Sequence, residues 1–475
     1  MPMKGLIWFR TDLRLDDNPA LLDAIDKCDE VAGIYIFSEN QWNDHNESNV
    51  KLSFLIKNLE ILEKSLSNLN IPLITLNTNS FKSLPKDLNN FSVTNNINQV
   101  FWNNEFGINE SKRDDLSAQI LNNSNIHVSR FDDQVIYEPG ILRTGQGKPF
   151  SVFTPFKRRW IENFDMNFLE IRKPSALKKS ISLNNESSKI QYSKIHKVDI
   201  DLWPAGEDAA AARLSNFLEL KSRDYNQSRN SPILDGTSRI SPYLALGILS
   251  PRRCILEGMK LNNFELTSGN KGICKWIDEI VWREFYRNIM HSFPKVSLNK
   301  PFQDYTDSIK WRHCDNELKA FYEGRTGFPI VDAGIRQMLT EGWMHNRLRM
   351  VVAMFFTKNM LHDWRLGEEF FMKNLIDGDF SSNNGGWQWS ASTGTDAAPY
   401  FRIFNPITQS QNFDPNGDFI KKFIPELKDV SLKNIHQPKQ DLFSSSDYPA
   451  PMLDLKTSRL RAIEAFKTAR EFNNS

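Results

Sequence analysis

Hydrophobic and polar positions in the first 130 residues alternate between two patterns. Short apolar runs occupy Leu6–Phe9, Val31–Phe37, Ile71–Leu76 and Val100–Trp102. Between these runs, Pro19–Lys27 and Asn49–Leu69 carry apolar residues at helical spacing. Asn18 followed by Pro19 marks a helix start, because asparagine caps helices and proline suits their first turn. Alternating strands and helices predict an α/β Rossmann-like domain, with a parallel sheet covered by helices on both faces.

The pattern changes along the rest of the chain. Residues 131–205 show weak periodicity, and Ala176–Ile200 is rich in serine, lysine and asparagine, which is typical of a surface linker. From residue 206 onward strand patterns give way to helical ones, at 271–291, 331–340, 343–361 and 455–471. We therefore expect an α/β domain over 1–130, a linker over 131–205 and a large all-α domain over 206–475.

Composition narrows the class of protein. The 475 residues are 40% hydrophobic and 25% charged, with a net charge of +1, as in an ordinary globular protein. No run of about 18 apolar residues predicts a membrane span, and no signal-peptide pattern opens the chain. Four scattered cysteines favour reduced thiols in the cytoplasm. Near-zero net charge excludes a protein coated with positive charge, although a local basic groove stays open.

Several common binding sites are excluded because their sequence motifs are absent or incomplete. No G-x-G-x-x-G follows a predicted strand, so the dinucleotide fingerprint is absent. Gly140 and Gly145 have the spacing of a phosphate-binding loop, but Gln146 stands where the lysine is required. Because the chain has neither C-x-x-C nor H-E-x-x-H, we expect no metal.

Tryptophan is concentrated in one part of the chain. Seven of the 12 tryptophans fall between residues 276 and 389. They indicate either a well-packed core or an aromatic system that serves a flat conjugated ligand.

Two segments of the C-terminal half combine polar and capping residues. In Asp235–Ser241, Thr237 and Ser238 are expected to cap a helix whose N-terminus, with Arg239, suits a phosphate. An ordinary capped helix is the alternative. Asp377–Trp389 mixes acidic, amide and glycine residues with paired tryptophans, and predicts a polar loop against a flat ligand.

Two predicted helices carry mixed polar and aromatic faces. Glu279, Trp282, Arg283 and Tyr286 lie at i, i+3, i+4 and i+7, so they share one face that could stack a base and bind its edge. The alternative is a Glu–Arg pair among packing aromatics. Within Trp343–Met350, the shared helix face of Asn346, Arg349 and Met350 indicates either the polar wall of a buried site or a basic edge exposed to solvent.

These segments together resemble the DNA photolyase/cryptochrome family, in particular bacterial class I cyclobutane pyrimidine dimer photolyases with a folate antenna. The resemblance covers essentially the whole chain. It rests on Leu6–Asn18, Thr237–Ser241, Trp282–Tyr286, Trp343–Met350, Asp377–Trp389 and Thr393–Pro406. It implies an N-terminal antenna domain and a helical domain that binds FAD.

The resemblance also implies a role for individual residues. For FAD it implies Tyr225, Thr237, Ser238, Arg239, Ile240, Ser241, Arg349, Asp377, Gly378, Asp379 and Asn383, the last beside the reactive flavin nitrogen. For catalysis on a flipped-out dimer it implies Glu279, Trp282, Asn346, Met350 and Trp389. For DNA it implies Arg229, Glu279, Arg283, Asn346, Arg347 and Gln409.

The electron path and the antenna follow from the same resemblance. Trp387, Trp364 and Trp311 match a chain that photoreduces the oxidised flavin. His45, Asn109 and Glu110 match a 5,10-methenyltetrahydrofolate antenna site. Leu298 replaces a lysine that is common in folate-binding relatives, so a deazaflavin antenna is the alternative.

The implied activity is light-driven repair of pyrimidine dimers, in which excited reduced FAD donates an electron to the dimer. The alternatives on this fold are a cryptochrome photoreceptor and a (6-4) photolyase. A light-independent flavoprotein or a plain nucleic-acid binder is a third class, and near-neutral charge disfavours the nucleic-acid binder. We expect a monomer in the bacterial cytoplasm, with DNA as its partner, no membrane association and a place on the nucleoid when it acts.

Overall fold

The computed structural model describes residues 2–184, 199, 201–438 and 447–472. These residues form two compact units. The first contains residues 1–223 and 238–294, and the second contains 224–237 and 295–475. Each unit is described below by itself.

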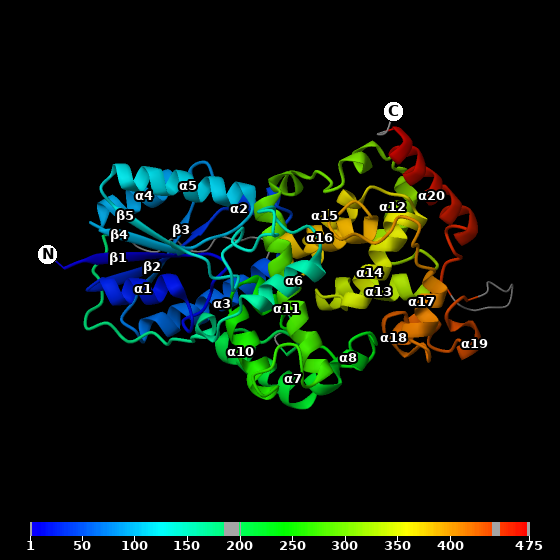
Figure 1. Cartoon of the computed structure of the whole chain (residues 1–475), viewed down its shortest axis with the longest axis horizontal. Coiled ribbons are helices and arrows are strands. Elements are labelled where there is room, and N and C mark those ends of the chain that lie inside the picture. Colours follow the sequence, from blue (N-terminus) through cyan, green and yellow to red (C-terminus); the bar gives the residue numbers. More distant parts are fainter. Residues whose placement is uncertain (1, 185–198, 200, 439–446, 473–475) are drawn as a thin grey trace. The chain divides into compact units, whose positions relative to one another are not determined.

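A five-stranded parallel sheet forms the start of the first unit, with the order β3-β2-β1-β4-β5. The strands are β1 (Lys4–Phe9), β2 (Glu30–Phe37), β3 (Leu73–Asn77), β4 (Gln99–Asn103) and β5 (His127–Phe131). Helices α4 (Leu84–Thr94) and α5 (Ile108–Asn123) cover one face, and α1 (Pro19–Lys27) and α3 (Asn49–Ser67) cover the other (Figure 1). The predicted α/β fold class is therefore confirmed.

Local sequence explains how the sheet is packed. The Asn18 side chain accepts a hydrogen bond from the Leu21 amide at 3.2 Å, so the predicted helix start is confirmed. Leu6 of β1 and Val100 of β4 are fully buried beneath α4 and α5. Trp8 and Trp102 meet edge to face at 5.5 Å, which fixes the centre of this core.

The remainder of the first unit is helical. Its longer helices are α6 (Phe153–Glu162), α7 (Glu207–Leu220), α10 (Pro251–Leu261) and α11 (Lys271–Ser292). Helix α11 matches the expectation for 271–291. Helix α6 lies where weak periodicity predicted only a linker, because Phe153, Phe156 and Trp160 pack its buried face. Residues 185–198 and 200 of the predicted linker lie outside the described residues.

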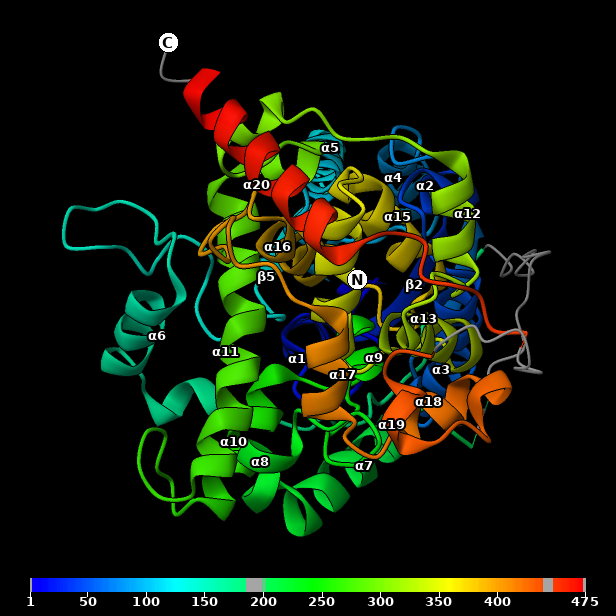
Figure 2. The ribbon, with the colours of Figure 1, turned by 90° about the vertical axis from the view of Figure 1, so that its right-hand side faces the viewer.

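The second unit is built from helices. They include α8 (Tyr225–Ser228), α12 (Asp315–Tyr322), α13 (Pro329–Glu341), α14 (Asn346–Met354), α15 (Trp364–Asn374), α16 (Phe380–Ala391), α17 (Pro406–Phe413), α18 (Asp418–Phe423), α19 (Leu432–Ile435) and α20 (Leu455–Phe472). A short π-helix, Phe355–Asn359, continues α14. Figure 2 shows α20, in red, along one side of this unit. Its hydrophobic core joins α13, α14, α15, α16 and α18.

Candidate functional site

Helix α11 carries the mixed face that the sequence predicts. Trp282 is half-buried, and its indole lies near the rings of Phe285 and Tyr286, at 5.6 and 5.7 Å. The Glu279 carboxylate lies 3.6 Å from the Lys275 ammonium, in a half-buried i,i+4 pair. Arg283 donates to the backbone carbonyls of Gln134 and Leu244. A carboxylate, an indole and a guanidinium therefore share one stretch of helix.

Buried polar contacts fix α11 against the segment that follows β5. The Glu284 carboxylate accepts hydrogen bonds from the amides of Ile136 and Tyr137, at 2.7 and 3.2 Å. It also accepts from the Trp160 indole at 3.0 Å. Burial raises the pKa of Glu284 to about 7, although these hydrogen bonds lower it in part. Sequence reasoning missed this anchor because its partners lie between 124 and 148 residues away along the chain.

The segment Thr237–Ser241 does not have the predicted capping. Helix α9 spans Ser241–Ala245, with Ile240 at its N-cap position and no side-chain hydrogen bond at that cap. Thr237 and Ser238 lie too early, because Arg239 adopts a left-handed φ of 48° and Pro242 fixes the first turn. The Ser238 hydroxyl instead accepts a hydrogen bond from the Trp276 indole at 3.3 Å. The capping prediction was wrong.

Helix α14 of the second unit begins at Asn346, where the His345 side chain accepts from the Arg347 amide. The expected helix at 343–361 therefore starts three residues later. One terminal nitrogen of Arg349 donates to both carboxylate oxygens of Asp377, at 2.8 and 3.0 Å, so these two predicted cofactor residues are held together. The Arg349 Nε also donates to the Met344 carbonyl at 2.8 Å, which holds the guanidinium at a second point.

Three arginines of the second unit gather around α14. Arg347 donates to the Asn230 side chain at 2.8 Å and lies 4.5 Å above the Phe413 ring. Burial lowers the pKa of Arg347, and the positive charges of Arg229 and Arg402 lower it further. Arg402 was missed as a site residue, although it lies within the Thr393–Pro406 motif. The cluster concentrates positive charge in a chain that is nearly neutral overall.

The segment Asp377–Trp389 is largely helical. Helix α16 spans Phe380–Ala391, and the Asp379 carboxylate caps it by accepting from the Ser382 amide at 2.9 Å. The expected polar loop was therefore wrong from Phe380 onward. The buried side chains of α16, Trp387 and Ala391 among them, add core packing to this cap and so offset the poor helix propensity of the two glycines.

A buried hydrogen-bond network holds Asn383 on α16. Its side chain donates to the Glu368 carbonyl at 3.0 Å, and neighbouring Asn384 donates to the Glu368 carboxylate at 3.1 Å. Gln388 extends the network by donating to Asn384 at 2.9 Å. Burial raises the pKa of Glu368 to about 7, although the Asn384 bond opposes that shift. Sequence reasoning missed Glu368.

The predicted electron-path tryptophans belong to one hydrophobic core. Trp387 and Trp364 are 2% and 1% exposed, and the partly buried Trp311 packs against the same cluster. A Cβ at Gly367 would overlap the Trp387 ring, so glycine is required there for α15 to approach α16. The half-buried Trp389 also lies on α16.

The three predicted antenna residues meet at one edge of the first unit. The His45 ring lies 3.3 Å from the Asn109 amide nitrogen and 3.4 Å from the Glu110 carboxylate. Burial raises the pKa of Glu110, and His45 opposes this shift. Leu298, in the second unit, is 54% exposed.

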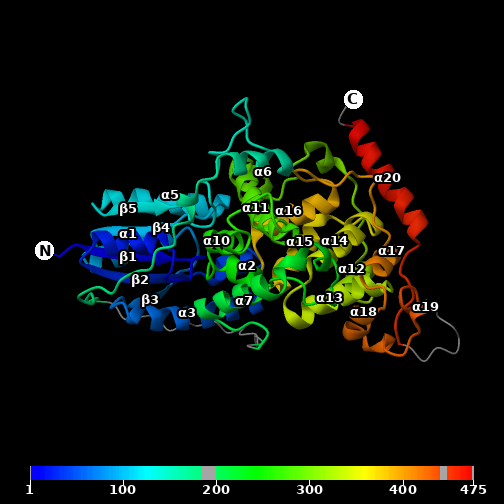
Figure 3. The same ribbon diagram turned by 60° about the horizontal axis from the view of Figure 1, so that its bottom comes forward.

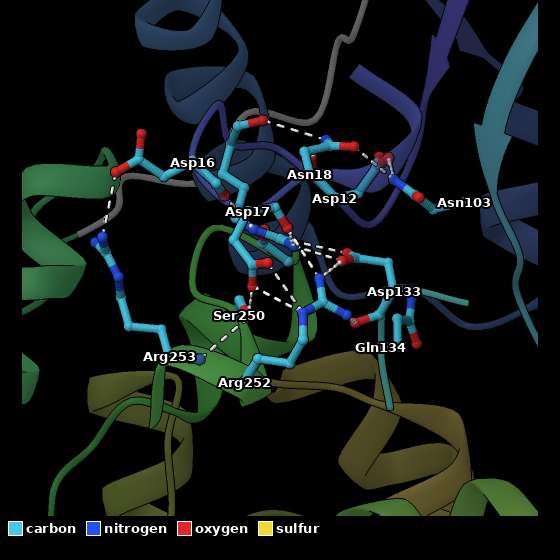
Figure 4. Close-up of polar contacts among 12 residues, drawn as sticks. Asp12, Asp16, Asp17, Asn18, Asn103, Asp133, Gln134, Ser250, Arg252 and Arg253 are labelled. Carbon is cyan, nitrogen blue, oxygen red and sulfur yellow. Dashed lines mark hydrogen bonds and ion pairs between the residues drawn. The ribbon is translucent and has the colours of Figure 1, made fainter. Parts of the chain in front are cut away.

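A buried ion network lies between the loop after β1 and α10. Arg252 binds Asp17 at 3.0 Å and Asp133 at 2.7 Å (Figure 4). Arg14 binds both carboxylate oxygens of Asp133, one of them at 2.8 Å, and shares the other oxygen with Arg252. All four charged side chains are nearly inaccessible to water. The network ties the α/β part of the first unit to its helical part.

The described residues show neither a membrane-spanning helix nor a metal site. Within the described ranges, no helix combines the length and hydropathy that a bilayer crossing requires. Over those same residues, no group of three histidine, cysteine or carboxylate side chains is arranged to hold a metal ion.

Comparison with known proteins gives consistent matches along the chain. The family model described as DNA photolyase matches residues 5–176. The model described as the FAD binding domain of DNA photolyase matches residues 276–468. A deoxyribodipyrimidine photo-lyase of Vibrio cholerae is 40% identical, over 98% of this chain and 99% of the relative.

Solved structures agree with these matches. A class III photolyase from Agrobacterium tumefaciens superposes with a TM-score of 0.89 at 32% identity, covering 99% of this chain and 98% of its own. A Synechocystis cryptochrome gives a TM-score of 0.88 at 27% identity, covering 98% and 99%. Sequence and fold therefore lead to one assignment: this chain belongs to the DNA photolyase family.

Proposed function

We propose that this protein is a deoxyribodipyrimidine photo-lyase that uses light to repair cyclobutane pyrimidine dimers in DNA, with FAD as its cofactor. The observation that carries the proposal is the end-to-end similarity to relatives of that name, at 40% identity in the Vibrio cholerae protein. The 32% identity to a solved class III photolyase supports it.

The residues of the second unit fit a bound flavin. Asn383 and Asp379 supply hydrogen-bonding groups from α16, while Arg349 is locked by Asp377. The buried indole N–H of Trp387 has no acceptor among the described residues, as expected of a group beside a ligand. When bound and reduced, FAD supplies the light-absorbing electron donor. The remaining FAD contacts, Tyr225, Thr237, Ser238, Arg239, Ile240, Ser241 and Gly378, form part of the proposal.

Residues on α11 would receive the lesion. A pyrimidine turned out of the helix would stack on the half-buried Trp282 indole. The Glu279 carboxylate, on the same helix face, would hydrogen-bond the base edge. Flipping costs less for a damaged, poorly stacked site, so this pocket would select the lesion.

Residues of the second unit are also proposed to bind the lesion and the DNA strand. Asn346 is exposed at the start of α14, Met350 lies one turn further along, and Trp389 is half-buried on α16. The Arg229–Arg347–Arg402 cluster would bind phosphates, since placing anions there relieves like-charge repulsion. Arg283 and Gln409 are further proposed DNA contacts.

Light-driven reduction of the resting flavin would use Trp387, Trp364 and Trp311 in sequence. Their common hydrophobic cluster supports this order, because it excludes water around the two inner rings. The antenna is proposed to be a methenyltetrahydrofolate held by His45, Asn109 and Glu110, with a deazaflavin as the alternative.

The proposal assigns residues 1–130 to the antenna, 131–205 to a linker and 206–475 to FAD and DNA. The protein would act as a monomer in the cytoplasm, on the nucleoid.

A repair assay tests the function. Purified protein should carry flavin and remove thymine dimers from an oligonucleotide under blue or near-ultraviolet light, with no repair in darkness. Repair of the (6-4) lesion alone, or light-driven flavin reduction without repair, would instead favour a (6-4) photolyase or a cryptochrome.

A further inference from the structure

Trp282 has a second aromatic ring stacked directly on it. The ring of Phe153 lies 3.7 Å from the indole, measured between centroids, and the two planes differ by only 10°. The other aromatic neighbours of Trp282 approach at tilted or edge-on angles of 37° and 84°. One face of the indole is therefore covered by a parallel ring, although Trp282 itself is only half-buried.

Phe153 is held in place by the docking of α6 on α11. It is the first residue of α6 and is 7% exposed. One turn further along, Lys157 forms an ion pair with Asp278 of α11 at 2.6 Å. Phe156 packs against Phe285 at 5.3 Å. Figures 2 and 3 both show α6 beside α11. The position of the ring is thus set by two helices.

We propose that Phe153 is a positioning residue that holds the Trp282 indole as a preformed platform for the flipped pyrimidine. This inference rests on the function proposed above. Parallel stacking restricts rotation of the indole about its χ2 bond, so less freedom is lost when a base stacks on the accessible part of the ring. Phe153 acts through Trp282 and has no part in bond breaking.

Loss of the Phe153 ring should therefore change the affinity for dimer-containing DNA without changing the repair reaction itself. Undamaged DNA is held mainly through its phosphates, whereas the extra affinity for a dimer depends on stacking in the pocket. Removing the Phe153 ring should weaken binding of dimer-containing DNA about three- to tenfold, a typical aromatic-pair effect. Binding of undamaged DNA should not change, and neither should the repair yield per absorbed photon once the enzyme is saturated.

The experiment compares three variants of the flavin-bound protein. Phe153→Leu removes the stacked ring, whereas Phe153→Tyr keeps an aromatic ring at this position. Phe156→Leu is the matched control, because it makes the same change on the same helix without touching Trp282. Dissociation constants are measured in the dark by fluorescence anisotropy, for one oligonucleotide with and without a thymine dimer. Repair yield is measured under saturating substrate.

We expect Phe153→Leu to lower the ratio of dimer to undamaged affinity, and Phe153→Tyr and Phe156→Leu to retain the wild-type ratio. Where Phe153→Leu loses flavin, Phe153→Met replaces it. An unchanged ratio, an equal loss for both oligonucleotides, or a lower saturated yield would overturn the inference. Failure of the wild-type protein to repair dimers in light would overturn the proposed function instead, so the two failures are distinguishable.

Discussion

The ion network around Asp133 leads to the most quantitative stability prediction. Asp133 lies between the guanidinium groups of Arg14 and Arg252, and its side chain is 1% exposed. Replacing it by asparagine keeps the shape but removes the negative charge that both arginines share. Asp17 would then be the one remaining carboxylate bound to Arg252.

Removing one member of a buried ion network leaves an uncompensated charge, which costs about 3–5 kcal/mol. We therefore expect Asp133→Asn to lower the free energy of unfolding by about that amount at pH 7. Burial alone raises the pKa of Asp133, but Arg14 and Arg252 outweigh it and hold that pKa below its ordinary value. The stability that the Asp133 carboxylate contributes is thus fully present above the ordinary pKa of aspartate. It disappears only as the pH falls through the lowered pKa of Asp133 in the folded protein.

The assay is urea denaturation of the wild type and variants, followed by circular dichroism. Glu257→Gln is the control, because its pair with Lys260 is exposed and is worth about 0–1 kcal/mol. Arg252→Met combined with Asp133→Asn should cost less than the sum of the two single changes, since the double variant removes one positive and one negative charge and leaves the network balanced. A loss below about 1 kcal/mol for Asp133→Asn would refute the reasoning, because it would match an exposed pair.

Four further predictions concern repair, flavin reduction, DNA binding and pH. Glu279→Ala should reduce the repair yield several-fold while flavin stays bound; wild-type yield at saturation would contradict its role. Trp387→Phe should abolish photoreduction of oxidised flavin but spare repair after chemical reduction, as flash spectroscopy and a repair assay can show. Arg402→Ala should lower the slope of log affinity against log salt by about 0.7–0.9, and an unchanged slope would exclude a phosphate contact. Burial raises the pKa of Glu368 to about 7, so the folded protein holds a proton on this carboxyl that the unfolded chain releases above pH 4.5. The free energy of unfolding should therefore fall as the pH rises from 4.5 to 7, by about 3 kcal/mol more in the wild type than in Glu368→Gln, as measured by urea titrations.

The sheet shows what local pattern can and cannot predict. Four strands are apolar runs, and their positions could be predicted because burial on both faces demands such runs. Strand β5 was not predicted, since it is an edge strand whose residues are mostly exposed or half-buried. Periodicity carries little signal where burial is weak.

Helix boundaries depended on capping geometry. The start at Asn18–Pro19 was correct because an asparagine cap and a following proline are both local signals. The prediction that Thr237 and Ser238 cap a helix was wrong because Arg239, which has a left-handed backbone conformation, separates them from the helix start. Helix α16 was missed because its glycines and asparagines are typical of loops, while its stability comes from the Asp379 cap and from the burial of Trp387 and Ala391 in the core.

Helical spacing alone could group candidate site residues only where they share one element; the others were predicted from the family resemblance. Glu279, Trp282 and Arg283 could be grouped from helical spacing alone. By contrast, the pairs Trp282–Phe153 and Arg349–Asp377 join separate elements. Such contacts arise from tertiary packing and leave no periodic signal in the sequence.

Light dependence of repair tests the central claim most directly. The flavin-bound protein is mixed with an oligonucleotide that holds one thymine dimer, divided between blue light and darkness, and the remaining dimer is quantified by chromatography. We predict loss of the dimer and recovery of intact thymines in the illuminated sample alone. Equal dimer content in the two samples, with the flavin fully reduced, would contradict the account.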